Sequence, residues 1–197
     1  MSEPGVGLSI PVILGSVRRD RVGVRAARLL MGALTARGHR PVLVDPLVEQ
    51  LPLLDRMYKE HPKGQAPANL ERLANLYRQA DGFVIVSGEY NNGIPPALKN
   101  LLDHFLEEYF WRPSAIVCYS AGQFGGVRAA MQLRMTLAEL GMSSVPSTLP
   151  IPRIAQALAE DGRPLEPWVE GRLDRFLGEF CWYARAMRRE RSGGTPY

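Results

Sequence analysis

The chain has 197 residues, of which 46% are hydrophobic and 22% are charged, and its formal net charge is +4. This composition is typical of a globular domain with a full core, and it excludes disordered and fibrous classes. The apolar runs, such as 83–86 and 115–118, are far shorter than the ~20 residues that cross a bilayer. We therefore expect one domain over residues 1–190, a flexible tail over 191–197, and no membrane partner.

Three further features bear on compartment and partners. Met1–Gly7 has no basic region followed by an apolar stretch, so no signal peptide is predicted. Cys118 and Cys181 have no motif spacing, and we expect buried thiols in a reducing compartment. Positive charge gathers in Arg18–Arg21 and Arg185–Arg191, but no zinc-finger spacing or RNA-binding aromatic signature accompanies it. The sequence therefore predicts cytoplasmic localisation and no nucleic-acid partner.

Strands and helices alternate along the chain. In chain order, apolar periodicity and Gly/Pro punctuation predict a strand over 8–14, a helix over 22–36, a strand over 41–45, a helix over 70–79, a strand over 82–86, a helix over 95–110, a strand over 114–119, a helix over 127–140, a weak strand over 142–145 and a helix over 168–189. The stretch 46–67 is long and rich in proline, so it is expected to be an irregular, functional or partner-facing connection. This alternation predicts an α/β fold with a doubly wound, five-stranded parallel sheet and helices on both faces.

In such sheets, ligands bind outside the carboxyl ends of the strands. Three loops leave those ends: loop 1 (Gly15–Gly23), loop 2 (Ser87–Pro96) and loop 3 (Ser120–Gly126). The most unusual residues of the sequence fall in these loops. The candidate site is therefore expected at this edge of the sheet.

Loop 1 leads into the start of a long helix, where free backbone N–H groups favour an anion. Ser16 can donate a hydrogen bond to a phosphate, and Arg18 or Arg21 can grip two of its oxygens. The loop matches neither the Gly-x-Gly-x-x-Gly dinucleotide pattern nor the P-loop pattern. The alternative is a capped, charged helix start that binds no ligand.

Loops 2 and 3 complete the predicted site. Glu89, Tyr90 and Asn91 suit the edge of a planar heterocycle, although Asn92-Gly93 also fits an ordinary turn. Loop 3 has three glycines in five residues, which allow close approach of a ligand to the backbone, or else a flexible turn. Because the three loops converge, they favour a phosphorylated, flat ligand.

Three ordered motifs carry a resemblance that covers roughly residues 8–147. They are Gly15-Ser16-x-Arg18-x-x-Arg21-x-Gly23, then Glu89-Tyr90-Asn91 with Ile94-Pro95, Leu98-Lys99-Asn100 and Asp103, then Ser120-x-Gly122-x-x-Gly125-Gly126-x-Arg128-Ala129. With these motifs the chain resembles the NADPH-dependent FMN reductase family, which includes quinone, azo-dye and chromate reductases. The sequence departs from the family at Gly88, where proline is usual.

The resemblance implies a flavodoxin-like fold, FMN as cofactor, NADPH or NADH as co-substrate, and a homodimer or homotetramer. It also implies which residues contact FMN. Ser16, Arg18, Arg21 and Val22 would surround its phosphate; Gly88, Glu89, Tyr90, Asn91 and Asn92 would border the isoalloxazine ring; and Ser120, Gly122 and Gln123 would lie on the pyrimidine side of the ring.

The expected function is therefore hydride transfer from a nicotinamide nucleotide through FMN to a small acceptor, by a ping-pong mechanism. The acceptor would be a quinone, an azo compound, a metal oxyanion or free flavin. No catalytic side chain is expected, because the flavin carries the chemistry. His39, His61 and His104 have no ligand spacing, so no metal is predicted. The alternatives are a flavodoxin-like electron carrier that docks on protein partners, although such carriers are usually acidic, and an interaction domain without FMN.

Overall fold

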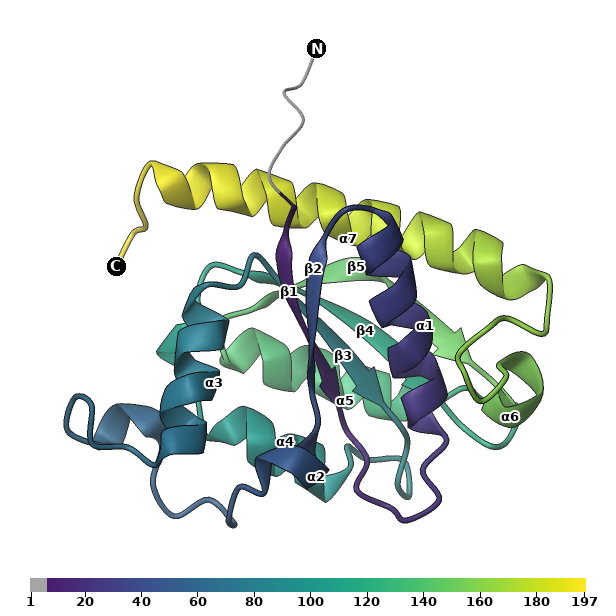
Figure 1. The fold of residues 1–197 in the computed structure, drawn as a ribbon, viewed down its shortest axis with the longest axis horizontal. Helices are drawn as coiled ribbons and strands as arrows, with labels where there is room; N and C mark the ends of the chain where they lie inside the picture. The colour runs from purple at the N-terminus through teal and green to yellow at the C-terminus, as the bar shows by residue number, and fades with distance from the viewer. Residues whose placement is uncertain (1–6) are drawn as a thin grey trace.

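The computed structural model describes residues 7–197 (Figure 1); residues 1–6, and with them most of the stretch in which no signal peptide is predicted, lie outside the described residues. The strands are β1 (Ser9–Leu14), β2 (Arg40–Val44), β3 (Phe83–Ser87), β4 (Pro113–Tyr119) and β5 (Ser143–Ile151). The α-helices are α1 (Gly23–Ala36), α2 (Pro46–Glu49), α3 (Ala68–Arg78), α4 (Pro96–Asp103), α5 (Val127–Glu139), α6 (Ile154–Ala157) and α7 (Trp168–Ser192), and two 3₁₀ turns are η1 (Tyr58–Glu60) and η2 (Glu107–Tyr109).

The five strands form one parallel sheet in the order β2-β1-β3-β4-β5. This is the flavodoxin-like order of a doubly wound sheet. Buried side chains of α1, α6 and α7 pack on one face of the sheet, and those of α3, α4 and α5 pack on the other. The predicted fold class is therefore confirmed, with helices covering both faces (Figure 1).

The central strands are almost wholly apolar because both of their faces are covered. Every residue of β3 and β4 is buried. Cys118 and Cys181 are both buried and free, as expected of isolated thiols. Within residues 7–197, no helix has the length and apolar character required to cross a bilayer.

The helix predicted over 95–110 is shorter in the structure, where α4 ends at Asp103. His104 Nδ1 lies 2.8 Å from the carbonyl oxygen of Asn100, and the chain then turns so that Phe105 and Tyr109 enter the core. There the two rings pack against Tyr77 at centroid distances of 4.9 and 5.4 Å. The α-helix thus ends before these residues, and the 3₁₀ turn η2 carries Tyr109 into the core.

The weak strand predicted over 142–145 is also incorrect in extent, since β5 continues to Ile151. Pro146 and Pro150 lie within β5, which is tolerated because β5 is an edge strand. Its carboxyl end therefore reaches the same edge as loops 1, 2 and 3. The other differences are smaller: α7 continues through Ser192 and not Arg189, and the connection 46–67 contains α2 and η1.

Candidate functional site

Loops 1, 2 and 3 lie side by side because they follow β1, β3 and β4, which are neighbours in the sheet. The amide of Gly15 donates to the carbonyl oxygen of Val86 at 2.9 Å, which joins the ends of β1 and β3. The hydroxyl groups of Ser16 and Tyr90 share a hydrogen bond of 3.2 Å. The structure therefore brings the predicted residues of loops 1 and 2 into contact.

Loop 1 presents an anion-binding arrangement. Ser16 is only 2% exposed, and its Oγ accepts a hydrogen bond of 3.4 Å from the Arg18 amide. No side chain caps the N-terminus of α1, whose first turn contains no acidic residue. The exposed guanidinium of Arg18 forms no hydrogen bond or ion pair with any described residue. A hydroxyl, a free guanidinium and an uncapped helix start suit a phosphate.

Arg21 has a different environment from Arg18. Its guanidinium donates to both carboxylate oxygens of Asp45, at 2.6 and 2.5 Å, and to the carbonyl oxygen of Ser16 at 2.9 Å. The two paired side chains are only 15% and 10% exposed. Arg21 therefore braces loop 1 through Asp45 and Ser16, and its place beside the phosphate, which the resemblance implies, stays a prediction. Sequence reasoning missed Asp45, although its position at the end of the second strand puts it at this edge.

Tyr119, which sequence reasoning also missed, occupies the space between loops 1 and 2. A β-carbon on Gly23 would lie 2.2 Å from the Tyr119 hydroxyl, and one on Gly88 would lie 3.2 Å from the ring. Burial raises the pKa of Tyr119 to about 12, and a hydrogen bond with Ser16 opposes this rise. The glycine at position 88, where the family usually has proline, therefore makes room for the Tyr119 ring.

Loop 2 contains a tight turn at Asn91-Asn92. Both residues have positive φ angles, 49° and 67°, and Tyr90 and Gly93 pair across the turn with N···O distances of 3.1 and 2.9 Å. Positive φ at both central residues is the requirement of a type I′ turn, which asparagine tolerates. The ordinary-turn alternative therefore accounts for the asparagines, with the turn placed one residue earlier than Asn92-Gly93.

Glu89 and Arg128 join loop 2 to loop 3. The Glu89 carboxylate accepts hydrogen bonds from the amides of Arg128 and Ala129, at 3.1 and 3.3 Å, in the first turn of α5. The Arg128 guanidinium forms an ion pair with Glu89 at 3.5 Å, donates to Asn92 Oδ1, and lies 4.5 Å from the Phe124 ring centroid. Glu89 thus stabilises the positive end of α5. Arg128 belongs to the third sequence motif. Its place in that motif was the only sequence signal that could have pointed to its contact with Glu89.

Loop 3 combines a closed base with an open tip. Ser120 Oγ donates to the carbonyl oxygen of Gly122 at 2.8 Å and accepts from the Gly125 amide at 2.9 Å. At the base, Gly126 has φ 77°, and a β-carbon there would lie 2.7 Å from the Tyr119 carbonyl oxygen. At the tip, a β-carbon on Gly122 would meet no atom within 4 Å, and Gln123 is exposed. The backbone amides of 121–123 donate no hydrogen bond within the described chain, so they are available to a ligand.

These residues fit a phosphorylated, planar group such as FMN. Ser16, Arg18 and the start of α1 supply donors for the phosphate, and Val22 forms the N-cap of that helix. The open surface at Gly122 and the free amides beside it suit a flat ring with polar atoms along one edge.

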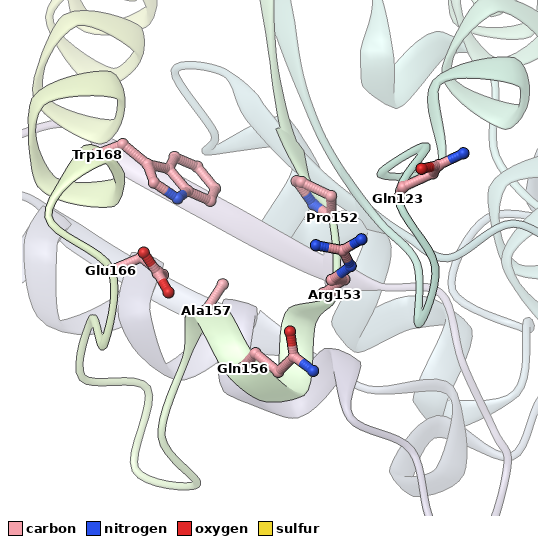
Figure 2. Close-up of a pocket in the computed structure, with 7 residues that line it drawn as sticks. All are labelled: Gln123, Pro152, Arg153, Gln156, Ala157, Glu166 and Trp168. Atoms are coloured by element: carbon pink, nitrogen blue, oxygen red, sulfur yellow. The ribbon is translucent and has the colours of Figure 1, made fainter.

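A cavity of about 380 Å³ lies on the other side of loop 3 (Figure 2). It is lined by Gln123, Pro152, Arg153, Gln156, Ala157, Glu166 and Trp168. Only Gln123 among these residues was predicted. The others follow β5, whose carboxyl end the sequence pattern placed six residues too early.

Comparison with curated proteins finds several reductases similar to this chain. An NAD(P)H-dependent FMN reductase of Schizosaccharomyces pombe is 39% identical over 110 residues, which cover 51% of each chain. A quinone reductase of Escherichia coli is 34% identical over 134 residues, covering 66% of this chain and 69% of the relative. A quinone reductase of Pseudomonas putida is 29% identical over 186 residues, covering 91% and 96%. The chain thus spans about half the length of the S. pombe relative and nearly all of the P. putida relative.

Solved structures share the fold. The flavoenzyme NAD(P)H:(acceptor) oxidoreductase of Paracoccus denitrificans superposes with a TM-score of 0.68 at 19% identity, covering 92% of this chain and 98% of that one. The family model described as NADPH-dependent FMN reductase matches residues 8–156, which is more than half of the chain. The chain therefore belongs to the NADPH-dependent FMN reductase family.

Proposed function

We propose that this protein is a cytoplasmic, FMN-dependent NAD(P)H oxidoreductase that reduces a small acceptor. The observation that carries the proposal is the grouping of buried Ser16, unpaired Arg18 and the uncapped start of α1 beside the open tip of loop 3. Membership of the family supports FMN as the bound group. The names of similar proteins, which include quinone reductase, NADPH azoreductase and NAD(P)H-dependent FMN reductase, support a quinone, an azo compound or free flavin as acceptor.

The protein residues bind and orient in this proposal. Arg18 and Ser16 hold the phosphate, while Arg21 and Asp45 fix the backbone that carries Ser16. The amides of 121–123 face the polar edge of the ring and stabilise negative charge there through preorganised dipoles. When bound, FMN supplies the hydride chemistry itself, so no side chain is assigned as acid or base.

The exposed tip of loop 3 supports a ping-pong order. Gly122 and Gln123 are open to solvent, so this side of the site is accessible to small molecules. We propose that the nicotinamide nucleotide and the acceptor occupy the same open side in turn. An electron carrier would instead need a surface for a protein partner, and the basic net charge of +4 is unlike the acidic surface usual for such carriers.

Mixing the FMN-loaded protein with NADH or NADPH separates these functions. Bleaching of the flavin absorbance, followed by its return when a quinone is added, supports the reductase. Flavin that stays oxidised with both nucleotides favours the electron carrier. Protein that takes up no FMN overturns both and leaves an interaction domain.

Arg18→Ala tests the phosphate site directly. Loss of a charge-assisted contact should raise the dissociation constant of FMN by about 10- to 100-fold, measured by quenching of flavin fluorescence. Arg19→Ala removes the same charge from the next exposed position and serves as the matched control. Unchanged FMN affinity in Arg18→Ala would show that the phosphate lies elsewhere.

We further propose that two copies associate through α5. Met131 and Met135 are 51% and 70% exposed and share one side of this helix with Val127, and Phe124, in loop 3 just before the helix, is 57% exposed. Exposed apolar side chains in a row are typical of an interaction surface. The stripe continues from loop 3, so a second copy would lie close to the site. Sedimentation velocity measures whether the protein is a dimer, a tetramer or a monomer.

A further inference from the structure

We propose that the cavity beside loop 3 binds the adenosine diphosphate half of the nicotinamide nucleotide. This inference rests on the proposed function, because it assigns a place to the co-substrate of that reaction. Of the cavity residues, only Gln123 belongs to the predicted flavin site. The cavity volume of about 380 Å³ lies within the usual range of small-ligand sites.

Arg153 supplies a free positive charge. Its backbone amide donates to the carbonyl oxygen of Gly122 at 2.9 Å, which ties it to the tip of loop 3. Its guanidinium is exposed and forms no hydrogen bond or ion pair with any residue in the described range. Nearby Arg25 and Arg28, in contrast, donate to the carbonyl oxygens of Leu158 and Glu160, at 2.9 and 2.5 Å. Arg153 is therefore the arginine available to the oxygens of a pyrophosphate.

Arg153 also has a strained backbone. Its φ angle is 43°, in the left-handed region that non-glycine residues rarely adopt. Such conformations cost free energy and gather at ligand sites. The contact with Gly122 holds Arg153 in this conformation.

Trp168 supplies a flat apolar surface. It is half-buried at the first position of α7, and the Arg172 guanidinium lies 4.9 Å from its ring centroid. Figure 2 shows the indole projecting into the cavity from the wall opposite Arg153. An adenine ring can stack on an indole, and such contacts add to the free energy of simple burial.

Glu166 distinguishes a nucleotide from a simple anion. Its carboxylate lines the cavity, is exposed, and has no hydrogen-bond or ion-pair partner among residues 7–197. A carboxylate repels inorganic phosphate but accepts hydrogen bonds from the ribose hydroxyl groups of an adenine nucleotide. The side-chain amide of Gln156 lies between Glu166 and Arg153 along the cavity floor (Figure 2).

The order of these residues gives the direction of binding. Gln123 and Arg153 lie at the end next to the tip of loop 3, and Trp168 and Glu166 form the far wall (Figure 2). A dinucleotide with its nicotinamide at loop 3 would therefore place its pyrophosphate at Arg153 and its adenosine at Trp168.

Calorimetric titration of ADP into the FMN-bound protein tests the inference, because loop 1 is then filled and flavin chemistry is not measured. We expect ADP to bind, Arg153→Gln to weaken its affinity about tenfold or more, and Trp168→Leu to weaken it roughly threefold to tenfold. Arg163→Gln is the matched control, since this exposed arginine lies on the same connection but does not line the cavity. In steady-state assays, Arg153→Gln should raise KM for NADH and NADPH by similar factors and leave kcat unchanged.

Three results would overturn the inference: no ADP binding by the FMN-bound protein, equal ADP affinity in Arg153→Gln, or binding of inorganic pyrophosphate as tight as that of ADP. The last would show a merely cationic surface. Flavin retention is measured separately by absorbance, and ADP is also titrated into flavin-free protein. Failure to retain FMN counts against the proposed function, whereas an FMN-bound protein indifferent to ADP counts against the cavity alone.

Discussion

At the carboxyl edge of the sheet, two regions differ in the environments of their arginines and glycines. In the first region, Arg21 pairs with Asp45 and Arg128 pairs with Glu89, so each arginine is held by a carboxylate of the protein. In the second region, the exposed guanidinium of Arg18 has no such partner among the described residues. The glycines divide in the same way: Gly126 is enclosed by the backbone of Tyr119, while Gly122 faces open space.

This difference separates residues that build the edge from residues that are free to meet a ligand. An enclosed glycine or a paired arginine contributes to stability, and its replacement should unfold or distort the loop. An open glycine or an unpaired arginine contributes little to stability, and its replacement should change binding alone. The same residue type therefore has two distinct functions within one loop.

The two glycines of loop 3 give the largest expected contrast. Gly126→Ala requires a left-handed alanine and places a β-carbon 2.7 Å from the Tyr119 carbonyl oxygen, so the free energy of unfolding should fall by about 3 kcal/mol. Gly122→Ala should change it by less than about 0.5 kcal/mol, yet weaken FMN binding because the methyl group enters the open surface. Urea denaturation and FMN titration measure the two effects. Equal free energies of unfolding for the two variants would show that the base of loop 3 is no more important for stability than its tip.

Asp45→Asn should have the next largest effect. It leaves the largely buried Arg21 guanidinium without its counter-charge, and we expect the free energy of unfolding to fall by about 2 kcal/mol. FMN affinity should also fall, because Arg21 holds the carbonyl group of Ser16. Asp20→Asn, at an exposed position of the same loop, is the control. If both variants proved equally stable, Arg21 would not be a bracing residue.

Glu89→Gln should have the smallest effect on stability. It tests whether the Glu89 carboxylate stabilises the start of α5. Removing the negative charge from the start of α5 should reduce stability by about 1 kcal/mol, and less at high salt. Glu139→Gln makes the same change at the exposed end of the same helix, where the dipole favours positive charge. It should therefore be neutral or slightly stabilising. A loss of stability in Glu139→Gln equal to that in Glu89→Gln would mean that the dipole is not involved.

The fold was predictable because the central strands are apolar on both faces and are separated by helices of clear periodicity. β5 was not, because Pro146 and Pro150 interrupt its pattern, and only its position at the sheet edge makes these prolines acceptable. The misplaced end of β5 also hid Arg153, Glu166 and Trp168. The residues that follow a strand end lie at that edge of the sheet. Because the end of β5 was predicted too early, the cavity residues that follow it were not predicted.

The candidate site was predictable as a set of loops but not as a set of roles. Arg18 and Arg21 look equivalent in the sequence, and only the fold brings Asp45, 24 residues beyond Arg21, against one of them. Tyr119 likewise lies at the end of an ordinary buried strand, and nothing local marks it as the residue that Gly23 and Gly88 accommodate. Such roles depend on contacts between distant segments.

The carboxylate of Glu89 at the first turn of α5 also determines the polarity of the whole edge. Three helices, α1, α4 and α5, begin at loops 1, 2 and 3, and the start of a helix attracts an anion. α5 is already neutralised from within, and α4 starts with Pro95 and Pro96, which have no N–H to offer. Of these three helices, α1 alone has a start with free N–H groups and no capping side chain. On the proposed function, the charged tail of a mononucleotide would be attracted there before its ring makes any contact.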